Sequence, residues 1–200
     1  MSRDLLSLPG DLRQPQHKAL VDHWLDLYRA GNGRIPAVQE IDALRLGRHL
    51  PDICILDHEG GDVFRFRIAG GNVNEFYGQD VARRDMTTIV ESPTRERLLG
   101  MAHAIIERPA AILHGLSSMM PEWNYSLALQ RISLPLAGPD GALRHIISAN
   151  AYFRYERSQA QMQSGIAAVD AEFQHDYRIP VGAEAQALLA AERASARSAG

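Results

Sequence analysis

Apolar residues recur at helical spacing near the beginning of the chain. Between Gln16 and Ala30 they lie three or four positions apart, which places them on one side of a helix. The Gly-Asn-Gly run at 31–33 ends this helix. We therefore predict an amphipathic helix and a connector over residues 16–40, after an irregular arm over residues 1–15. The apolar stripe of the helix consists of Leu20, Val21, Trp24, Leu27 and Tyr28.

The pattern then changes to that of β-strands. Residues 52–57 are apolar on both faces, whereas residues 63–69 alternate between apolar and polar. The His-Glu-Gly-Gly-Asp sequence between them is typical of a turn, which predicts an antiparallel hairpin. Three more strand-like runs follow, at residues 110–118, 125–137 and 143–155.

Helical spacing returns between the hairpin and the later strands. Residues 71–77 form a short predicted helix that follows Gly70 and ends at Gly78. Residues 92–109 begin with Ser92 at an N-cap position and predict a longer helix. Because strands are grouped and do not alternate with helices, a parallel fold is excluded. The order predicts an α+β fold, a five-stranded antiparallel sheet with helices on one face, preceded by the amphipathic helix.

Two stretches of sequence, together with this element order, resemble the PAS superfamily of sensor domains. They are IDALRLGRHLPDICILD at 41–57 and FRFRIAGGNVNEFYGQDVARRD at 64–85. More narrowly, the chain is similar to a divergent family of small stand-alone PAS-like bacterial proteins. The resemblance assigns a PAS-like domain to residues 41–156 and leaves residues 157–200 as a polar, Ala-rich C-terminal extension. One departure is Arg83, which stands where most family members have the glycine of a glycine-arginine pair.

Composition narrows the class of protein further. The net charge is −3, without the basic stripe that nucleic-acid binding requires. No run approaches the ~18 apolar residues of a membrane span, and the N-terminus lacks the apolar core of a signal peptide. The single cysteine, Cys54, excludes a disulfide framework. We expect a cytoplasmic protein that binds neither nucleic acid nor a membrane.

The chain offers few candidates for metal or cofactor chemistry. Gly70, Gly71 and Gly78 lack the spacing and the following lysine of a phosphate-binding loop. None of the eight histidines stands in a metal-binding spacing, so no metal site is predicted. Haem-binding PAS domains commonly use a histidine on the long helix, where His103 lies, but helical spacing places His103 on the charged flank. Cys54 lies in an apolar strand, unlike the cysteine of flavin photosensors, so the sequence names no particular cofactor.

The strands carry the candidates for a ligand pocket. Alternate residues of a strand point to the same face, and small side chains at two such positions would leave space above the covered face of the sheet. The candidates are His145, Ile147, Ala149 and Ala151, together with His114 on an earlier strand.

Three functions stay open from the sequence. We favour a sensor or regulatory module without an output domain of its own, which binds a small ligand, a protein partner or both in signalling. The second is a small pocket enzyme in which His145 or His114 works with a nearby carboxylate, Asp57 or Asp62. The third is a haem- or flavin-binding sensor. The first is favoured because the chain shows no convergent set of acid, base, nucleophile and metal ligands.

The apolar stripe of the first helix has more large side chains than an exposed helix carries. Two surfaces could receive it, namely the sheet of its own chain or the same helix of a second copy. PAS-like domains commonly use their leading helix in dimers, so the resemblance favours a homodimer. Trp24 would be a central contact of that interface.

Overall fold

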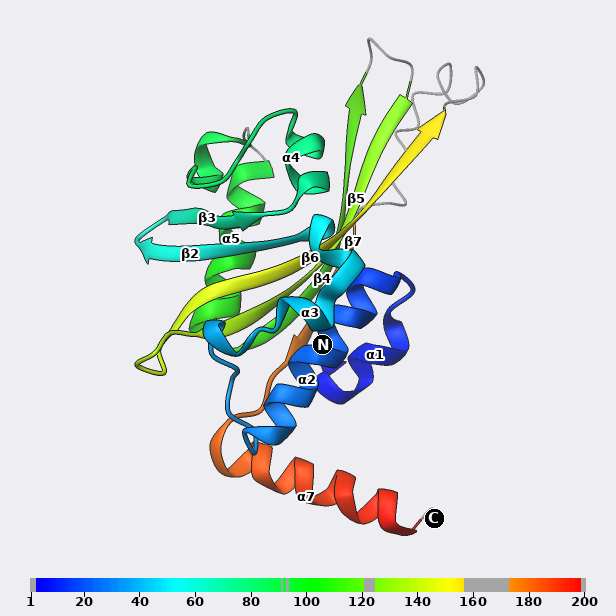
Figure 1. Ribbon diagram of the computed structural model, residues 1–200, viewed down its shortest axis with the longest axis vertical. Coiled ribbons are helices and arrows are strands. Elements are labelled where there is room, and N and C mark those ends of the chain that lie inside the picture. Colours follow the sequence, from blue (N-terminus) through cyan, green and yellow to red (C-terminus); the bar gives the residue numbers. More distant parts are fainter. Residues whose placement is uncertain (1–2, 91, 93, 121–124, 157–172, 199–200) are drawn as a thin grey trace.

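The strands in the described part of the chain form one sheet (Figure 1). The computed structural model describes residues 3–90, 92, 94–120, 125–156 and 173–198. Along the sheet the strands follow the order β1-β7-β4-β5-β6-β2-β3. Their bounds are β1 Arg3–Asp4, β2 Ile53–Gly60, β3 Val63–Ala69, β4 Ala110–Met120, β5 Tyr125–Ala137, β6 Leu143–Glu156 and β7 Phe173–Arg178.

The five strands predicted from the sequence form a continuous part of this sheet. They are β4, β5, β6, β2 and β3, and each adjacent pair in that order is antiparallel. β7 adds a sixth antiparallel strand beside β4, and the two-residue β1 pairs with β7 in parallel. The predicted α+β fold is confirmed, but the sheet extends further than expected and helices pack on both of its faces, whereas the sequence predicted them on one.

Helices cover both faces of the sheet (Figure 1). We call the face under α4 and α5 the inner face, and the opposite face, which α1 and α2 cover in part, the outer face. The inner core includes Phe66 of β3 and Ile105 of α5, and the outer core includes Ile132 of β5 and Leu20 of α2. The α-helices are α1 Leu8–Asp11, α2 Pro15–Ala30, α3 Ala43–Leu46, α4 Gly71–Tyr77, α5 Thr94–Glu107 and α7 Gly182–Ser198. The 3₁₀ helices are η1 Leu5–Ser7, η2 Val38–Glu40, η3 Gly47–Asp52 and η4 Met86–Thr88.

The apolar stripe of α2 packs on the sheet of its own chain. Leu27 is half-buried, and the fully buried members are Leu20, Val21, Trp24 and Tyr28. The Trp24 indole N–H donates to the backbone oxygen of Pro135 at 2.9 Å, and the Tyr28 hydroxyl donates to that of Pro180 at 2.6 Å. The assignment of these side chains to a dimer interface is therefore wrong, because one chain already buries them. The expected homodimer itself stays a prediction.

Both ends of the chain add to the outer core. Residues 1–15, expected to be irregular, contain η1 and α1 and bury Leu5, Leu8 and Leu12. The expected polar extension supplies β7 and α7, and α7 buries Ala185 and Leu189 in the same core. Residues 157–172 of that extension lie outside the described residues.

The turn from β3 into α4 requires glycine, as the sequence indicates. A Cβ on Gly70 would lie 2.3 Å from the backbone oxygen of Pro51, so only glycine allows this close approach. α4 then ends at Gly78, whose φ of 65° is left-handed. Arg83 also has a φ of 65°, a conformation that favours glycine. Its backbone N–H donates to the oxygen of Phe66 at 2.7 Å, and this bond holds the turn with an arginine in place of glycine.

Candidate functional site

A row of polar side chains crosses the inner face of the sheet. His114 of β4 lies directly opposite Arg131 of β5, which lies directly opposite Asn150 of β6. One step along the strands, Ser133 lies opposite Ser148, and their hydroxyl oxygens are 2.8 Å apart. All five side chains are buried, and we call them the polar row. Such groups cost free energy in a core unless they are hydrogen-bonded, so their partners decide what the row can do.

The guanidinium of Arg131 is the charged centre of the polar row. Its Nε donates to Oδ1 of Asn150 at 2.6 Å, and Nη2 donates to the Tyr77 hydroxyl of α4 at 3.3 Å. Burial lowers the pKa of Arg131, but Tyr77 and Cys54 raise it, and the net shift is upward, so the group stays charged. Within the described residues, no carboxylate forms an ion pair with this cation.

Two more groups on the inner face keep unused hydrogen-bonding capacity. Within the described part of the chain, neither ring nitrogen of His114 nor the hydroxyl of Tyr152 has a partner. Burial, and then the charges of Arg131 and Arg97, lower the pKa of His114 well below its ordinary value, so the imidazole is neutral at pH 7. Burial raises the pKa of Tyr152, so its phenol keeps its proton.

A small cavity lies between the polar row and the helices above it. Its volume of about 20 Å³ is enough for a water molecule. The roof is apolar and comes mainly from α5. The lining residues are Leu56, Met86, Leu98, Met101, Ala102, Ile105, His114, Arg131, Ser133, Ile146 and Ser148.

The outer face carries a much larger groove beside the part of the sheet that α2 covers. Its volume is about 980 Å³. Ile53 and Ile55 of β2 and Ile147 of β6 contribute aliphatic lining, and residues of η2, α3 and η3 also border it. The charged or titratable side chains of the lining are those of Arg67, Arg144 and His145. We call this space the outer groove.

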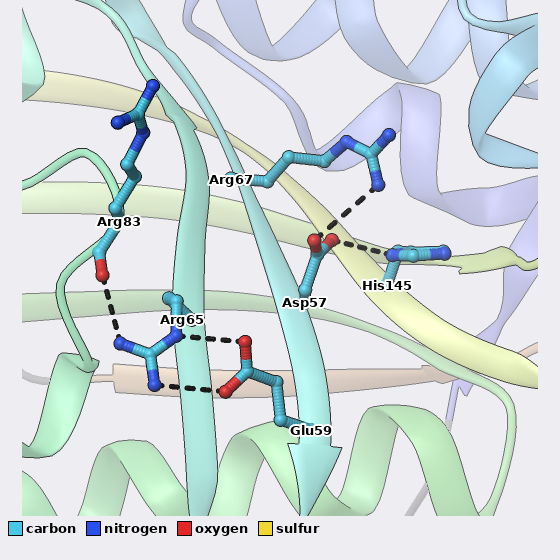
Figure 2. A network of polar contacts seen from close by, with 6 residues as sticks. All are labelled: Asp57, Glu59, Arg65, Arg67, Arg83 and His145. Carbon is cyan, nitrogen blue, oxygen red and sulfur yellow. Dashed lines mark hydrogen bonds and ion pairs between the residues drawn. The ribbon is translucent and has the colours of Figure 1, made fainter.

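Asp57 connects two of these groups (Figure 2). Nδ1 of His145 lies 2.7 Å from one carboxylate oxygen, and Nη1 of Arg67 lies 3.5 Å from the other. An ionised carboxylate only accepts hydrogen bonds, so Nδ1 of His145 carries the proton and Nε2 is the acceptor of the neutral ring. Arg65, drawn beside them, belongs to a separate contact in which it bonds both oxygens of Glu59, at 2.8 and 2.9 Å.

A β-bulge in β3 explains why Arg67 and Ile68 both line the outer groove. β3 pairs Phe66 with Leu56 and Ile68 with Ile55, which leaves Arg67 as an extra residue between two pairs. Phe66 points into the inner core. Strict alternation would send Ile68 there as well, but the bulge places it at the groove with 51% of its surface exposed.

Comparison with known proteins identifies the family. A family model described as a PAS domain matches residues 12–149, more than half of the chain. The chain belongs to the PAS domain family. Among solved structures, it is similar to a fungal LOV domain photoreceptor, with 16% identity and a TM-score of 0.39 over 68% of this chain and 94% of that chain. It is also similar to the LOV protein of Rhodobacter sphaeroides, with 11% identity and a TM-score of 0.40 over 93% and 99% of the two chains. No curated protein matches it.

In this PAS domain the predicted pocket residues divide between the two faces. His145 and Ile147 line the outer groove, and Ala149 lies in the outer core, the side to which Ala151 also belongs by strand alternation. Of the predicted pocket residues, His114 is the one that lines the small cavity on the inner face. The expectation of one shared pocket is therefore wrong, because strand parity groups residues on a face without showing which helices cover that face.

Of the histidine–carboxylate pairs considered for an enzyme, the structure brings one into contact. His145 and Asp57 are in contact as predicted, whereas Asp62 contacts Nε2 of His103 at 2.9 Å. His114 has no carboxylate partner within the described residues. The described lining of the outer groove contains no serine, threonine or cysteine that the His145–Asp57 pair could activate.

The cavity at the polar row does not fit a large cofactor. The inner cavity of about 20 Å³ is far smaller than a flavin ring or a haem. His103 lies on the flank of α5, bonded to Asp62 and 3.5 Å from Glu107, and does not line that cavity. No cluster of three metal-ligating side chains occurs within the described residues. In the same part of the chain, every helix is too short or too polar to span a membrane.

Sequence reasoning missed most of the polar row. Arg131 and Ser133 alternate with Ile132 and Leu134, a pattern typical of a strand with one face in water. The sequence held no clear signal against that interpretation, because the pattern of one strand does not show that α4 and α5 cover its polar face.

Proposed function

We propose that this PAS domain is a sensor module that binds a small anion at Arg131 on the inner face and responds through the helices above it. The observation that supports this most strongly is the buried guanidinium, for which the described residues offer no carboxylate. A buried charge without a counter-charge is costly, whereas a buried anion would form charge-assisted hydrogen bonds with it. His114 and Tyr152 supply further groups without partners on the same face.

The proposed response to an anion is a displacement of the residues that cover the small cavity at the polar row, the inner cavity. The cavity holds about one water molecule, so an anion of several atoms must displace the roof residues of α5, such as Met101 and Ile105. Tyr77 of α4 would also move, because its hydroxyl already contacts Arg131. A ligand that binds only the displaced arrangement shifts the population toward it, and a protein partner could detect that change.

The test compares Arg131→Met with Arg65→Met, which removes an arginine of the exposed Glu59 contact. Thermal unfolding is followed with formate, acetate, nitrate and phosphate at constant ionic strength, and binding is measured by calorimetry. We expect one anion to raise the melting temperature of the wild type and of Arg65→Met but not of Arg131→Met. A ligand at 100 times its Kd stabilises the folded state by about 2.7 kcal/mol, which is well within detection.

Two results contradict the proposal. One is that none of the anions binds to the wild type. The other is that Arg131→Met binds as the wild type does, which would make Arg131 a structural group for Asn150 and Tyr77. Circular dichroism checks that Arg131→Met folds, since loss of the bond to buried Asn150 costs about 1–3 kcal/mol.

A second candidate function is favoured by the His145–Asp57 contact at 2.7 Å, because a carboxylate-oriented imidazole can act as a general base at Nε2. Hydrolysis of a p-nitrophenyl ester panel tests it. Activity that is lost in Asp57→Asn and His145→Gln but kept in Arg65→Met would support an enzyme, and its absence from the wild type would count against one.

A further inference from the structure

The outer groove lies on the face opposite the polar row, and the anion proposal makes no use of it. Its volume of about 980 Å³ falls in the range of small-molecule sites, which are mostly apolar with a few convergent polar groups. Its lining is also mostly apolar, with aliphatic residues from β2, β6 and the segment of η2, α3 and η3. The charged or titratable groups come from β3 and β6.

Large apolar side chains are exposed around this groove. The exposed fractions are 51% for Ile68 and 40% for Leu50, both in the lining, and 89% for Leu44 on α3 beside it. Val181 is the fourth strongly exposed large apolar side chain in the described part of the chain, and it does not line this groove. The bulge at Arg67 creates the exposure of Ile68. Such a concentration of apolar surface is typical of a binding site.

The charged groups of the groove select the kind of molecule that fits it. Arg67 has one long contact to Asp57, at 3.5 Å, and Arg144 contacts Asp140. Within the described residues, the other N–H donors of these two guanidiniums have no partner. Asp57 is further engaged by His145. The free capacity is therefore that of donors, which favours an anionic head group.

We propose that the outer groove binds an amphipathic small molecule with an aliphatic body and a carboxylate head. The body would cover Ile53, Ile55 and Ile68, and the carboxylate would accept hydrogen bonds from Arg67 and Arg144. A second copy of the chain fits less well, because a two-fold contact centred on the groove would bring the same arginines of both copies together.

Calorimetry with dodecanoate, below its micelle concentration, tests the proposal. We expect one dodecanoate per chain. Dodecanol and dodecyltrimethylammonium, which share the body but lack the negative head, should bind at least about tenfold more weakly, the loss expected for one charge-assisted hydrogen bond. Arg67→Gln should weaken dodecanoate binding by about the same factor, and Ile68→Asp should abolish it. Arg65→Gln, the matched change two residues away on β3, should leave it unchanged.

Three results would overturn this site. They are the absence of saturable dodecanoate binding, equal binding of dodecyltrimethylammonium, and equal losses in Arg67→Gln and Arg65→Gln. Light scattering provides the remaining comparison. A wild-type dimer that Ile68→Asp dissociates, without dodecanoate binding, would assign the groove to a second copy and refute a small-molecule site. Arg131→Met should bind dodecanoate normally, which separates this proposal from that for the inner face.

Discussion

The two faces of the sheet reverse the usual distribution of polar and apolar groups. The inner face is covered by α4 and α5 yet carries a buried arginine, a neutral histidine and two serines, beside a cavity of about 20 Å³. The outer face is well packed under α2, but beside it an aliphatic groove of about 980 Å³ stays open. Core formation alone would favour apolar residues inside and polar residues at an open surface. Neither departure follows from core formation, which is the reason to look for function at each.

The largest predicted effect on stability concerns the part of the outer face that α2 covers. Trp24→Ala should destabilise the protein by about 3–5 kcal/mol, because it removes a fully buried indole and leaves the oxygen of Pro135 without its donor. Urea unfolding followed by circular dichroism measures the change. Leu44→Ala, on an exposed side chain, is the control and should have little effect.

The outcome for Trp24 also decides between the two interpretations of α2. A folded, monomeric Trp24→Ala variant from a dimeric wild type would restore the interface that the sequence suggested. Strong destabilisation at unchanged subunit number would confirm that α2 belongs to the core of one chain.

A buried histidine on α2 provides the second test, through pH. Burial lowers the pKa of His17 to about 4, against a weaker upward effect of its contact with the oxygen of Gln130. Above pH 6.5 both the folded and the unfolded chain hold this ring neutral. As the pH falls below 6.5, the unfolded chain binds a proton on this ring before the folded chain does. The free energy of unfolding therefore decreases as the pH is lowered to about 4, by about 3 kcal/mol in total.

Comparison with His17→Gln isolates this contribution. Between pH 7 and about 5 the wild type should lose about 2 kcal/mol more than the variant. The lowered pKa of His114 adds a loss of the same sign in both proteins, and most of it cancels in the difference, because His17 is the smallest of the causes that lower this pKa. Equal pH slopes for the two proteins would show that His17 is protonated without difficulty in the folded state.

The fold could be predicted because its elements are local patterns. The alternation in β3, the glycine stop at Gly78 and the stripe on α2 each lie within a few residues of sequence. β7 was missed although Phe173, His175 and Tyr177 alternate with polar residues, because the run is short, only Tyr177 is fully buried and the surrounding sequence is polar. The placement of α2 depended on whether the outer face was free, and a periodic pattern does not contain that information.

The candidate sites depended on relations between distant residues. The contact of His145 with Asp57 was anticipated as one of several pairs, yet the groove around it depends on a bulge that shifts Ile68 by one face. The polar row depends on the register that sets Arg131 opposite His114 and Asn150. A sequence shows the strands, but a slip of one residue in register would send these side chains to the other face.

The smallest predicted effect concerns the open part of the outer face. Ile68→Thr keeps a β-branched side chain on a strand and removes apolar surface that is already half exposed, so unfolding free energy should change by no more than about 0.5 kcal/mol. Ile105→Ala, in the closed inner core, is the contrasting change and should cost about 2–5 kcal/mol. Urea unfolding of both variants gives the comparison directly. If Ile68→Thr lowers the free energy of unfolding by more than about 1 kcal/mol, Ile68 contributes to the core. The apolar lining of the groove would then be explained by its contribution to folding. A negligible loss would leave binding as the reason for an exposed isoleucine at a bulge.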